Sequence, residues 1–243
     1  LHNIYGDRID CTASDCNNNN ALMIASMHNQ IDYITKLYKI YGDKINYNAI
    51  DKDNNNRLMI AARYGYIDCI TTLHNIYGDK IDCNVNDRNA LMIFANNGHS
   101  DCIKKLYKLF HDKVDDKVRN ALIVFALNGH SDCITALYNI YGDRIDCNAV
   151  DNTYQKQNAL MIAAAHDNRD YITTLYNVFG EKIDYSAVDH NNNNALMIAA
   201  GHGYADCITT LYNIYGDKLD CNSVDDNKRN ALILANLTGL VDC

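Results

Sequence analysis

Polar and apolar residues follow one another along this chain in a block that recurs. Each block opens with an asparagine and continues into a short apolar run, as in Asn194 followed by ALMIAA. The seven opening asparagines are Asn20, Asn56, Asn89, Asn120, Asn158, Asn194 and Asn230, and the steps between them are 36, 33, 31, 38, 36 and 36 residues. A period in this range is typical of stacked supersecondary units, so the pattern predicts a repeat solenoid.

Each block predicts two helices joined by a tight turn. Asparagine is a preferred N-cap because its side-chain oxygen accepts a hydrogen bond from a backbone N–H that has no partner in the helix, so we expect the seven asparagines to begin helices. Seven residues after each leucine stands a glycine, asparagine or aspartate such as Gly203, which tolerates a left-handed backbone and predicts the end of the first helix. An aspartate such as Asp206 then opens a second helix with one apolar stripe, which ends at Gly216.

The segment between that glycine and the next asparagine has no helical pattern. It contains stretches such as KIDCNAVD and a polar, asparagine-rich tip. The alternation of apolar and polar positions favours an extended strand with one face covered. The pattern therefore predicts an all-α repeat solenoid whose helix–turn–helix units are joined by extended arms with β-turn tips. Its expected boundaries are a partial repeat at 1–15, full repeats at 16–51, 52–86, 87–116, 117–151, 152–189 and 190–225, and a partial repeat at 226–243.

The stretch DHNNNNALMIAAGHGYADCITTLYNIYGD resembles the ankyrin repeat, and the resemblance covers essentially the whole chain. Asp189 matches the family's aspartate, Asn192 its turn glycine, Asn194 its capping threonine and Leu196 its leucine. The family's Thr-Pro-Leu-His has become Asn-Ala-Leu-Met, and the arm is longer in most copies. Tetratricopeptide repeats have a similar period but no non-helical arm of this length. The resemblance implies a protein-binding module whose partners lie on the first helices and the turn tips.

Composition narrows the classes of partner. The chain is 48% hydrophobic and 21% charged, as in ordinary soluble folded proteins, and its net charge is −8. This charge should repel nucleic acid and anionic lipid. The sequence has no apolar run long enough to span a bilayer. We therefore expect neither a nucleic-acid partner nor insertion into a membrane.

Ten cysteines and nine histidines raise the possibility of disulfide or metal chemistry. Nine of the cysteines fall in two columns of the repeat, where stacked helices about 8–10 Å apart are too distant for the roughly 7 Å between Cα atoms that a disulfide allows. No C-x-x-C occurs, and only His166 and His202 share a column in adjacent units. We therefore expect free thiols in an intracellular, reducing compartment, with the cytoplasm as the first choice. Without a phosphate-binding loop, a nucleophile elbow or a metalloprotease motif, the chain is not expected to be an enzyme or to need a cofactor.

The positions that vary most between repeats indicate where a partner protein would bind. Two adjacent columns of the first helix vary in this way, and we expect a partner to bind them on the extended concave face that solenoids offer. Together with tip residues, the predicted partner-binding set is Met27, His28, Arg63, Tyr64, Asn96, Asn97, Leu127, Asn128, Ala165, His166, Gly201, His202, Asn54, Tyr154, Gln155, Lys156 and Asn192. Tyr154 belongs to the longest arm and is the expected anchor. The alternative explanation of this variation is a surface under no selection.

A second functional hypothesis comes from the register of the chain ends. The segment 1–7 matches 73–79, and the segment 241–243 matches 67–69, so a gap of only three residues separates the last residue from the point where the first could recur. The alternative is therefore a structural protein whose copies stack end to end into a filament, or a part of a very long array. Near-identical units favour this alternative, whereas the short unit ending KVDDKVRN opposes it.

Overall fold

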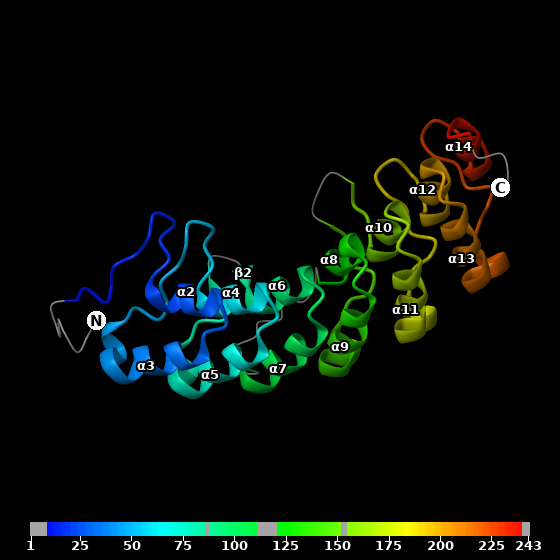
Figure 1. Cartoon of the computed structure of the whole chain (residues 1–243). Coiled ribbons are helices and arrows are strands. Elements are labelled where there is room, and N and C mark those ends of the chain that lie inside the picture. The colour runs from blue at the N-terminus through cyan, green and yellow to red at the C-terminus, as the bar shows by residue number, and fades with distance from the viewer. Residues whose placement is uncertain (1–8, 86–87, 111–120, 152–154, 240–243) are drawn as a thin grey trace. The chain divides into compact units, whose positions relative to one another are not determined.

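A computed structural model describes residues 9–85, 88–110, 121–151 and 155–239. The chain divides into two compact units, Leu1–Asp115 and Asp116–Cys243, called here the N-terminal and the C-terminal unit. Within each unit the helices form two layers (Figure 1). One layer holds the first helix of each repeat, and the other holds the second.

In the N-terminal unit the first helices are α2 (Ala21–Met27), α4 (Arg57–Arg63) and α6 (Ala90–Asn96). The second helices are α3 (Ile31–Tyr41), α5 (Ile67–Tyr77) and α7 (Ser100–Phe110). Single 3₁₀ turns, η2 (Gly42–Lys44) and η3 (Gly78–Lys80), follow α3 and α5. Helix α4 packs between α2 and α6, and α5 packs between α3 and α7.

The C-terminal unit repeats this arrangement. Its first helices are α8 (Ala121–Asn128), α10 (Ala159–Ala165), α12 (Ala195–His202) and α14 (Ala231–Leu237), each packed on the next. Its second helices are α9 (Ser131–Tyr141), α11 (Arg169–Phe179) and α13 (Ala205–Tyr215), which also pack in order. They end in the 3₁₀ turns η5 (Gly142–Arg144), η6 (Gly180–Lys182) and η7 (Gly216–Lys218). The predicted all-α solenoid of paired helices is confirmed.

Asparagine side chains begin the first helices. The side-chain oxygens of the capping asparagines accept a hydrogen bond from the backbone N–H three residues later, at 2.9–3.0 Å; these residues are Asn20, Asn56, Asn158, Asn194 and Asn230. Asn89 directly precedes α6, but nothing is described of its side chain, and Asn120 lies outside the described residues. Each bond satisfies one of the N–H groups that have no acceptor in the first turn.

The turns between paired helices have the left-handed backbone that their residue types predict. Here φ is +52° at Asn29, +53° at Asp167 and +79° at Gly203. At Gly65, where φ is +69°, the ring of His99 from the next repeat lies so close that an added Cβ would stand 2.8 Å from it. At Gly65 the packing of the next turn therefore adds to the preference that the left-handed backbone gives to glycine.

The prediction of an extended strand along each arm is wrong in most of its length. The strands in the described residues are β1 (Asn84–Val85) and β2 (Arg88–Asn89), an antiparallel pair of two residues each. Elsewhere the arm forms turns, because an aspartate holds it: the Asp146 carboxylate accepts the N–H of Asn148 at 3.1 Å, and the Asp146 carbonyl accepts the N–H of Ala149 at 3.3 Å. Aspartate side chains compete with sheet hydrogen bonds in this way. The expected covered face is confirmed, since Ile145 and Cys147 are buried.

Contacts between neighbouring repeats fix the stack. In the C-terminal unit, the buried hydroxyl of Tyr171 on α11 donates to the Leu122 carbonyl of the preceding repeat at 2.6 Å. The Asn148 side chain bridges two arms, donating to the Lys182 carbonyl at 2.8 Å and accepting the Asp184 N–H at 2.8 Å. These bonds hold neighbouring repeats of the C-terminal unit together.

Candidate partner-binding surface

In the N-terminal unit, the predicted columns lie at the C-terminal ends of the first helices. Met27 is half-buried, and the other members are exposed: His28, Arg63, Tyr64, Asn96 and Asn97. Because α2, α4 and α6 pack in order, these positions follow one another along one edge of the helix layer.

The Tyr64 ring stacks on that of Tyr66, with centroids 5.5 Å apart and an interplanar angle of 19°. Beside them, Nε2 of His99 lies 3.1 Å from the Arg63 carbonyl. Since a carbonyl oxygen only accepts, this nitrogen carries the proton. Tyr64 remains 45% exposed, so its ring offers a fixed aromatic surface to a partner.

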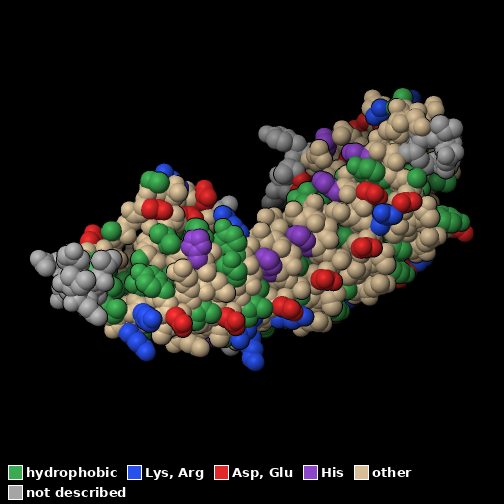
Figure 2. All heavy atoms as spheres, viewed as in Figure 1, with side chains coloured by type: hydrophobic (Ala, Val, Ile, Leu, Met, Phe, Trp, Pro, Cys, Tyr) green, Lys and Arg blue, Asp and Glu red, His purple; other side chains and the backbone are tan. Residues whose placement is uncertain are grey.

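In the C-terminal unit, the same columns alternate between protruding and small side chains. Leu127 on α8, Asn128, His166 and His202 are exposed, while Ala165 on α10 and Gly201 on α12 are half-buried. Histidine and hydrophobic side chains reach the surface near these helices (Figure 2). Because α8, α10 and α12 pack in order, these positions follow one another along the layer of first helices.

The tip residues carry the unusual backbone that the sequence indicates. Asn54, Lys156 and Asn192 have positive φ of +61°, +52° and +62°, and these residues and Gln155 are exposed. The Asn192 side chain donates to the Asp226 carboxylate of the next tip at 2.5 Å. Tyr154, the expected anchor, lies outside the described residues.

A cavity of about 250 Å³ lies in the C-terminal unit, where the predicted surface meets the tips. Its lining includes Gly201 and His202 of α12 and Gln155 of a preceding tip, all members of the predicted set. The remaining lining residues are Gln157, Asp189, Asn191, Asn193, Met197, Ile198, Arg229 and Leu234. The structure thus brings together residues that lie up to 79 positions apart in the sequence, from Gln155 to Leu234.

The imidazole of His202 is held in a defined state at this cavity. Its Nδ1 lies 2.9 Å from the Ile198 carbonyl of its own helix, and the ring stacks on Tyr204 with centroids 5.5 Å apart. The carbonyl can only accept, so Nδ1 is the protonated nitrogen and Nε2 of the neutral ring is an acceptor. His166 makes the same bond to Ile162 at 2.9 Å.

Sequence reasoning missed the residues that wall the cavity from the arms and from α14. Gln157, Asn191 and Asn193 stand beside or within the tips, and only their neighbours entered the prediction. Leu234 lies on α14, three residues before the Leu237 of the variable column. The repeat phase could have identified these positions, because each recurs at a fixed distance from a capping asparagine.

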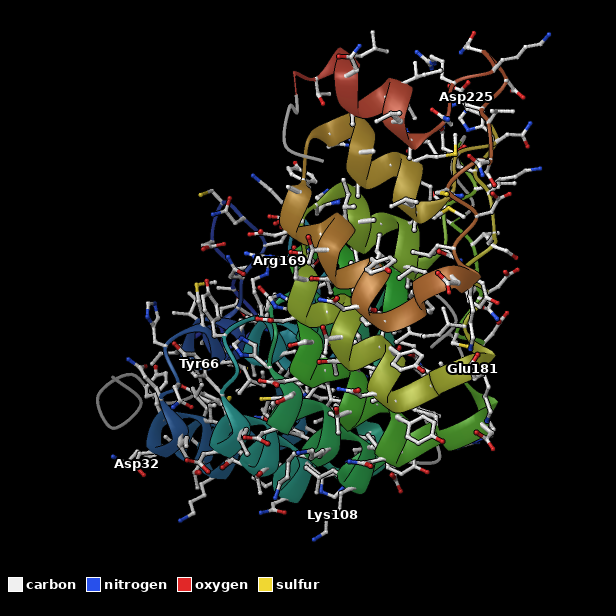
Figure 3. All side chains as sticks on the ribbon, turned by 90° about the vertical axis from the view of Figure 1, so that its right-hand side faces the viewer. Asp32, Tyr66, Lys108, Arg169, Glu181 and Asp225 are labelled. Atoms are coloured by element: carbon white, nitrogen blue, oxygen red, sulfur yellow. The ribbon has the colours of Figure 1, made fainter. Side chains whose placement is uncertain are left out.

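A second, polar cavity of about 450 Å³ surrounds the turn between α10 and α11. It holds Arg169, which pairs with Asp206 of the next repeat at 2.7 Å, and Asn168, which donates to the Ala126 carbonyl at 2.6 Å. Arg169 lies on the edge of the helix layers away from Glu181 and Asp225 of the arms (Figure 3). These bonds link neighbouring repeats, so the polar groups that border this cavity already have partners within the protein.

Burial makes several thiols poor nucleophiles. It raises the pKa of Cys69 to about 11, although a bond from Ser26 acts against it, and it raises the pKa of Cys102 and Cys207 to about 12 each. The nine cysteines within the described residues form no disulfide, and Cys16 and Cys221 are exposed. Over the same residues, the histidines, cysteines and acidic side chains form no group of three that could hold a metal ion. None of the helices described there combines the length and the apolar character that crossing a bilayer demands.

Comparison with known proteins agrees with this architecture. The model of the family described as ankyrin repeats (3 copies) matches residues 3–87, 58–151, 91–187 and 160–243. The structure is similar to the human ASB11 ankyrin repeat domain, with a TM-score of 0.71 and 16% identity over 89% of this chain and 92% of that one. It is also similar to the ankyrin repeat domain of Bcl-3, a member of the IkappaB family, with a TM-score of 0.69 and 15% identity over 93% and 98% of the two chains. No curated protein sequence matches the chain. Because the family model covers nearly all of the sequence, this chain belongs to the ankyrin repeat family.

Proposed function

We propose that this ankyrin repeat chain is a non-enzymatic interaction scaffold that holds a segment of a partner protein on the ends of its first helices and on its arm tips. Ankyrin repeat domains generally mediate binding between proteins, which supports the general class. The observation that carries the location is the cavity at Gly201, His202 and Gln155, where both parts of the predicted surface meet. The free thiols support a reducing, intracellular site of action.

Within each repeat, the positions that pack against neighbouring repeats differ from the positions that vary, and this difference supports the proposed location. Stacking uses buried positions such as Leu160 and Ala163 of α10, which are at most 1% exposed. The two variable columns have no such duty, and they include Tyr64 and Leu127, each 45% exposed. These exposed side chains are therefore available to a partner protein.

The test is selection of peptides from a random library displayed on phage against the whole chain, followed by binding assays with synthetic copies. Two variants place a charge on the surface, Tyr64→Asp in the N-terminal unit and Leu127→Asp in the C-terminal unit. Tyr212→Asp, at a residue 61% exposed on α13 of the other layer, is the matched control. We expect selected peptides to lose at least tenfold in affinity for one surface variant and to keep their affinity for the control. Peptides that bind all three variants as they bind the native chain would refute the proposed location.

Self-association is the second candidate function. On α14, Leu232 is 68% exposed and Leu237 is 66% exposed, whereas Leu196, the equivalent of Leu232 on α12, is 8% exposed beneath α14. Another repeat placed on α14 would cover the same apolar surface, and a second copy of the chain is one source of such a repeat. Sedimentation at rising concentration tests this candidate. We expect association that Leu232→Asp abolishes, and a monomer at every concentration would exclude a filament.

A further inference from the structure

The size of the cavity at Gly201 limits what it can accept. Its volume of about 250 Å³ is below the roughly 300–1,000 Å³ typical of small-molecule sites. It is therefore better suited to one side chain of a larger partner than to a whole cofactor or metabolite.

The floor of the cavity is apolar, and Gly201 keeps it open. Met197, Ile198 and Leu234 line it, each at most 9% exposed. A Cβ added to Gly201 would meet Leu234 Cβ at 3.9 Å, an ordinary contact, so the space above the helix backbone is unfilled rather than forbidden. In the same column of α8 the chain carries Leu127, which shows that a leucine is compatible with this helix position.

The charged groups in the lining are already paired. The Asp189 carboxylate accepts the N–H groups of Asn191 and Asn193 at 2.9 and 2.8 Å. Arg229 pairs with Asp225 at 2.7 Å. A charged side chain entering the cavity would have to compete with these bonds for either group, which is unfavourable.

The rim, in contrast, is rich in groups that bind peptide bonds. Side-chain amides each carry a donor and an acceptor, and four of them border the cavity, on Gln155, Gln157, Asn191 and Asn193. The Asn193 nitrogen already donates to the Asp189 carboxylate at 3.3 Å, so Asn193 offers its oxygen. His202 adds an acceptor at Nε2. These groups match the N–H and C=O of an extended main chain better than they match an ionic ligand.

We propose that the cavity at Gly201 receives one apolar side chain from an extended, uncharged segment of the partner, whose main chain bonds to the amide rim. This inference rests on the proposed function and specifies the partner's chemistry at one position. Gly201 is then the residue that determines specificity, because a larger side chain there would occupy the partner's place.

The experiment uses the whole chain and the selected peptides that Leu127→Asp weakens. Gly201→Leu fills the cavity with the side chain found at the same column of α8, and leucine has a higher helix propensity than glycine, so the fold should persist. Gly201→Ala, which fills little of the space, is the matched control, and circular dichroism verifies both folds. By fluorescence polarisation we expect Gly201→Leu to weaken these peptides at least tenfold and Gly201→Ala less than threefold. Replacing the single apolar residue of the peptide by lysine should weaken binding to the native chain at least tenfold.

The outcomes separate the two proposals. Peptides that Leu127→Asp weakens but Gly201→Leu does not would overturn the inference about Gly201 and leave the interaction surface standing. Peptides that need a charged residue where the apolar one is expected would overturn the proposed chemistry. A library that yields no peptide sensitive to any surface variant would overturn both.

Discussion

Asn56 joins two parts of its repeat, and its two bonds can be separated by substitution. Its side-chain oxygen accepts the N–H of Met59 at 3.0 Å and caps α4, while its amide nitrogen donates to the carbonyl of Asp82 in the arm at 2.7 Å. The residue is fully buried. Asn56→Ser retains an oxygen that caps the helix but does not reach the arm, whereas Asn56→Ala removes both bonds.

The expected costs follow from the two bonds. Loss of an N-cap costs about 1 kcal/mol. Loss of the bond to the arm costs about 1 kcal/mol, because the Asp82 carbonyl is only partly buried and water can replace the amide. We therefore expect Asn56→Ser to lower the free energy of unfolding by about 1 kcal/mol and Asn56→Ala to lower it by about 2 kcal/mol.

The assay is urea unfolding followed by far-UV circular dichroism, with the slope against urea compared between variants so that changes in cooperativity are detected. Asn194→Ser is the control. Its asparagine caps α12 through Met197 at 2.9 Å, and among the described residues its amide bonds no arm carbonyl. Asn194→Ser should therefore cost no more than a few tenths of a kcal/mol. If Asn56→Ser proves as stable as the native chain, or if Asn56→Ala costs no more than Asn56→Ser, the division into a cap and an arm bond is wrong.

Four further predictions concern packing and chemistry. Arg57 is 1% exposed between the rings of Tyr47 and Tyr77, burial lowers its pKa to about 10, and its Nε and Nη2 atoms lack hydrogen-bond partners. Arg57→Met should therefore raise the free energy of unfolding, measured in urea melts, by about 1–3 kcal/mol. A loss of stability would contradict this prediction. Tyr171→Phe should cost about 1–3 kcal/mol, because it leaves the Leu122 carbonyl without its donor, and a neutral result would show that the bond contributes nothing. Gly65→Ala should cost more than Gly239→Ala in thermal melts, because both end a first helix with positive φ, +69° and +75°, but only the Cβ added at Gly65 would meet the His99 ring, at 2.8 Å; equal losses would mean that the ring moves freely. With a thiol reagent at pH 8 and peptide mapping, Cys16 and Cys221 should react at least one hundredfold faster than Cys69, Cys102 and Cys207, which are buried and have raised pKa values; uniform rates would indicate global opening.

The helices could be predicted from the sequence because their signals are local. A capping asparagine, a left-handed turn and a glycine after the apolar stripe each act within one or two turns of chain. The arms could not, because an aspartate such as Asp146 can either stand on a strand or bond the N–H two residues later. The alternation of Ile145 and Cys147 gave the correct buried face for either geometry, so periodicity alone did not distinguish them.

The exposed columns could also be predicted, since a position that varies between copies has no stacking duty. Arg57 shows the limit of this reasoning. The other six blocks carry alanine at its position, so variation would suggest an exposed residue, yet Arg57 is 1% exposed. Its long side chain lies between the rings of Tyr47, from the preceding arm, and Tyr77, from the following second helix α5. Variation between copies therefore marks positions where the repeats differ, and only the packing shows whether the side chain at such a position faces a partner or the interior.

The cavity at Gly201 illustrates why a binding site in a solenoid is harder to predict than its fold. A single column gives the sequence no reason to prefer Gly201 over Ala165, since both are small. The difference lies in what adjoins them: Leu234 from the following repeat forms one wall, and Gln155 from the preceding tip forms another. Each wall belongs to a different copy of the repeat, so the site forms only where three neighbouring repeats pack together. Specificity in such a stack is set by combinations of ordinary residues, and changing one of them, as in Gly201→Leu, should alter binding without altering the fold.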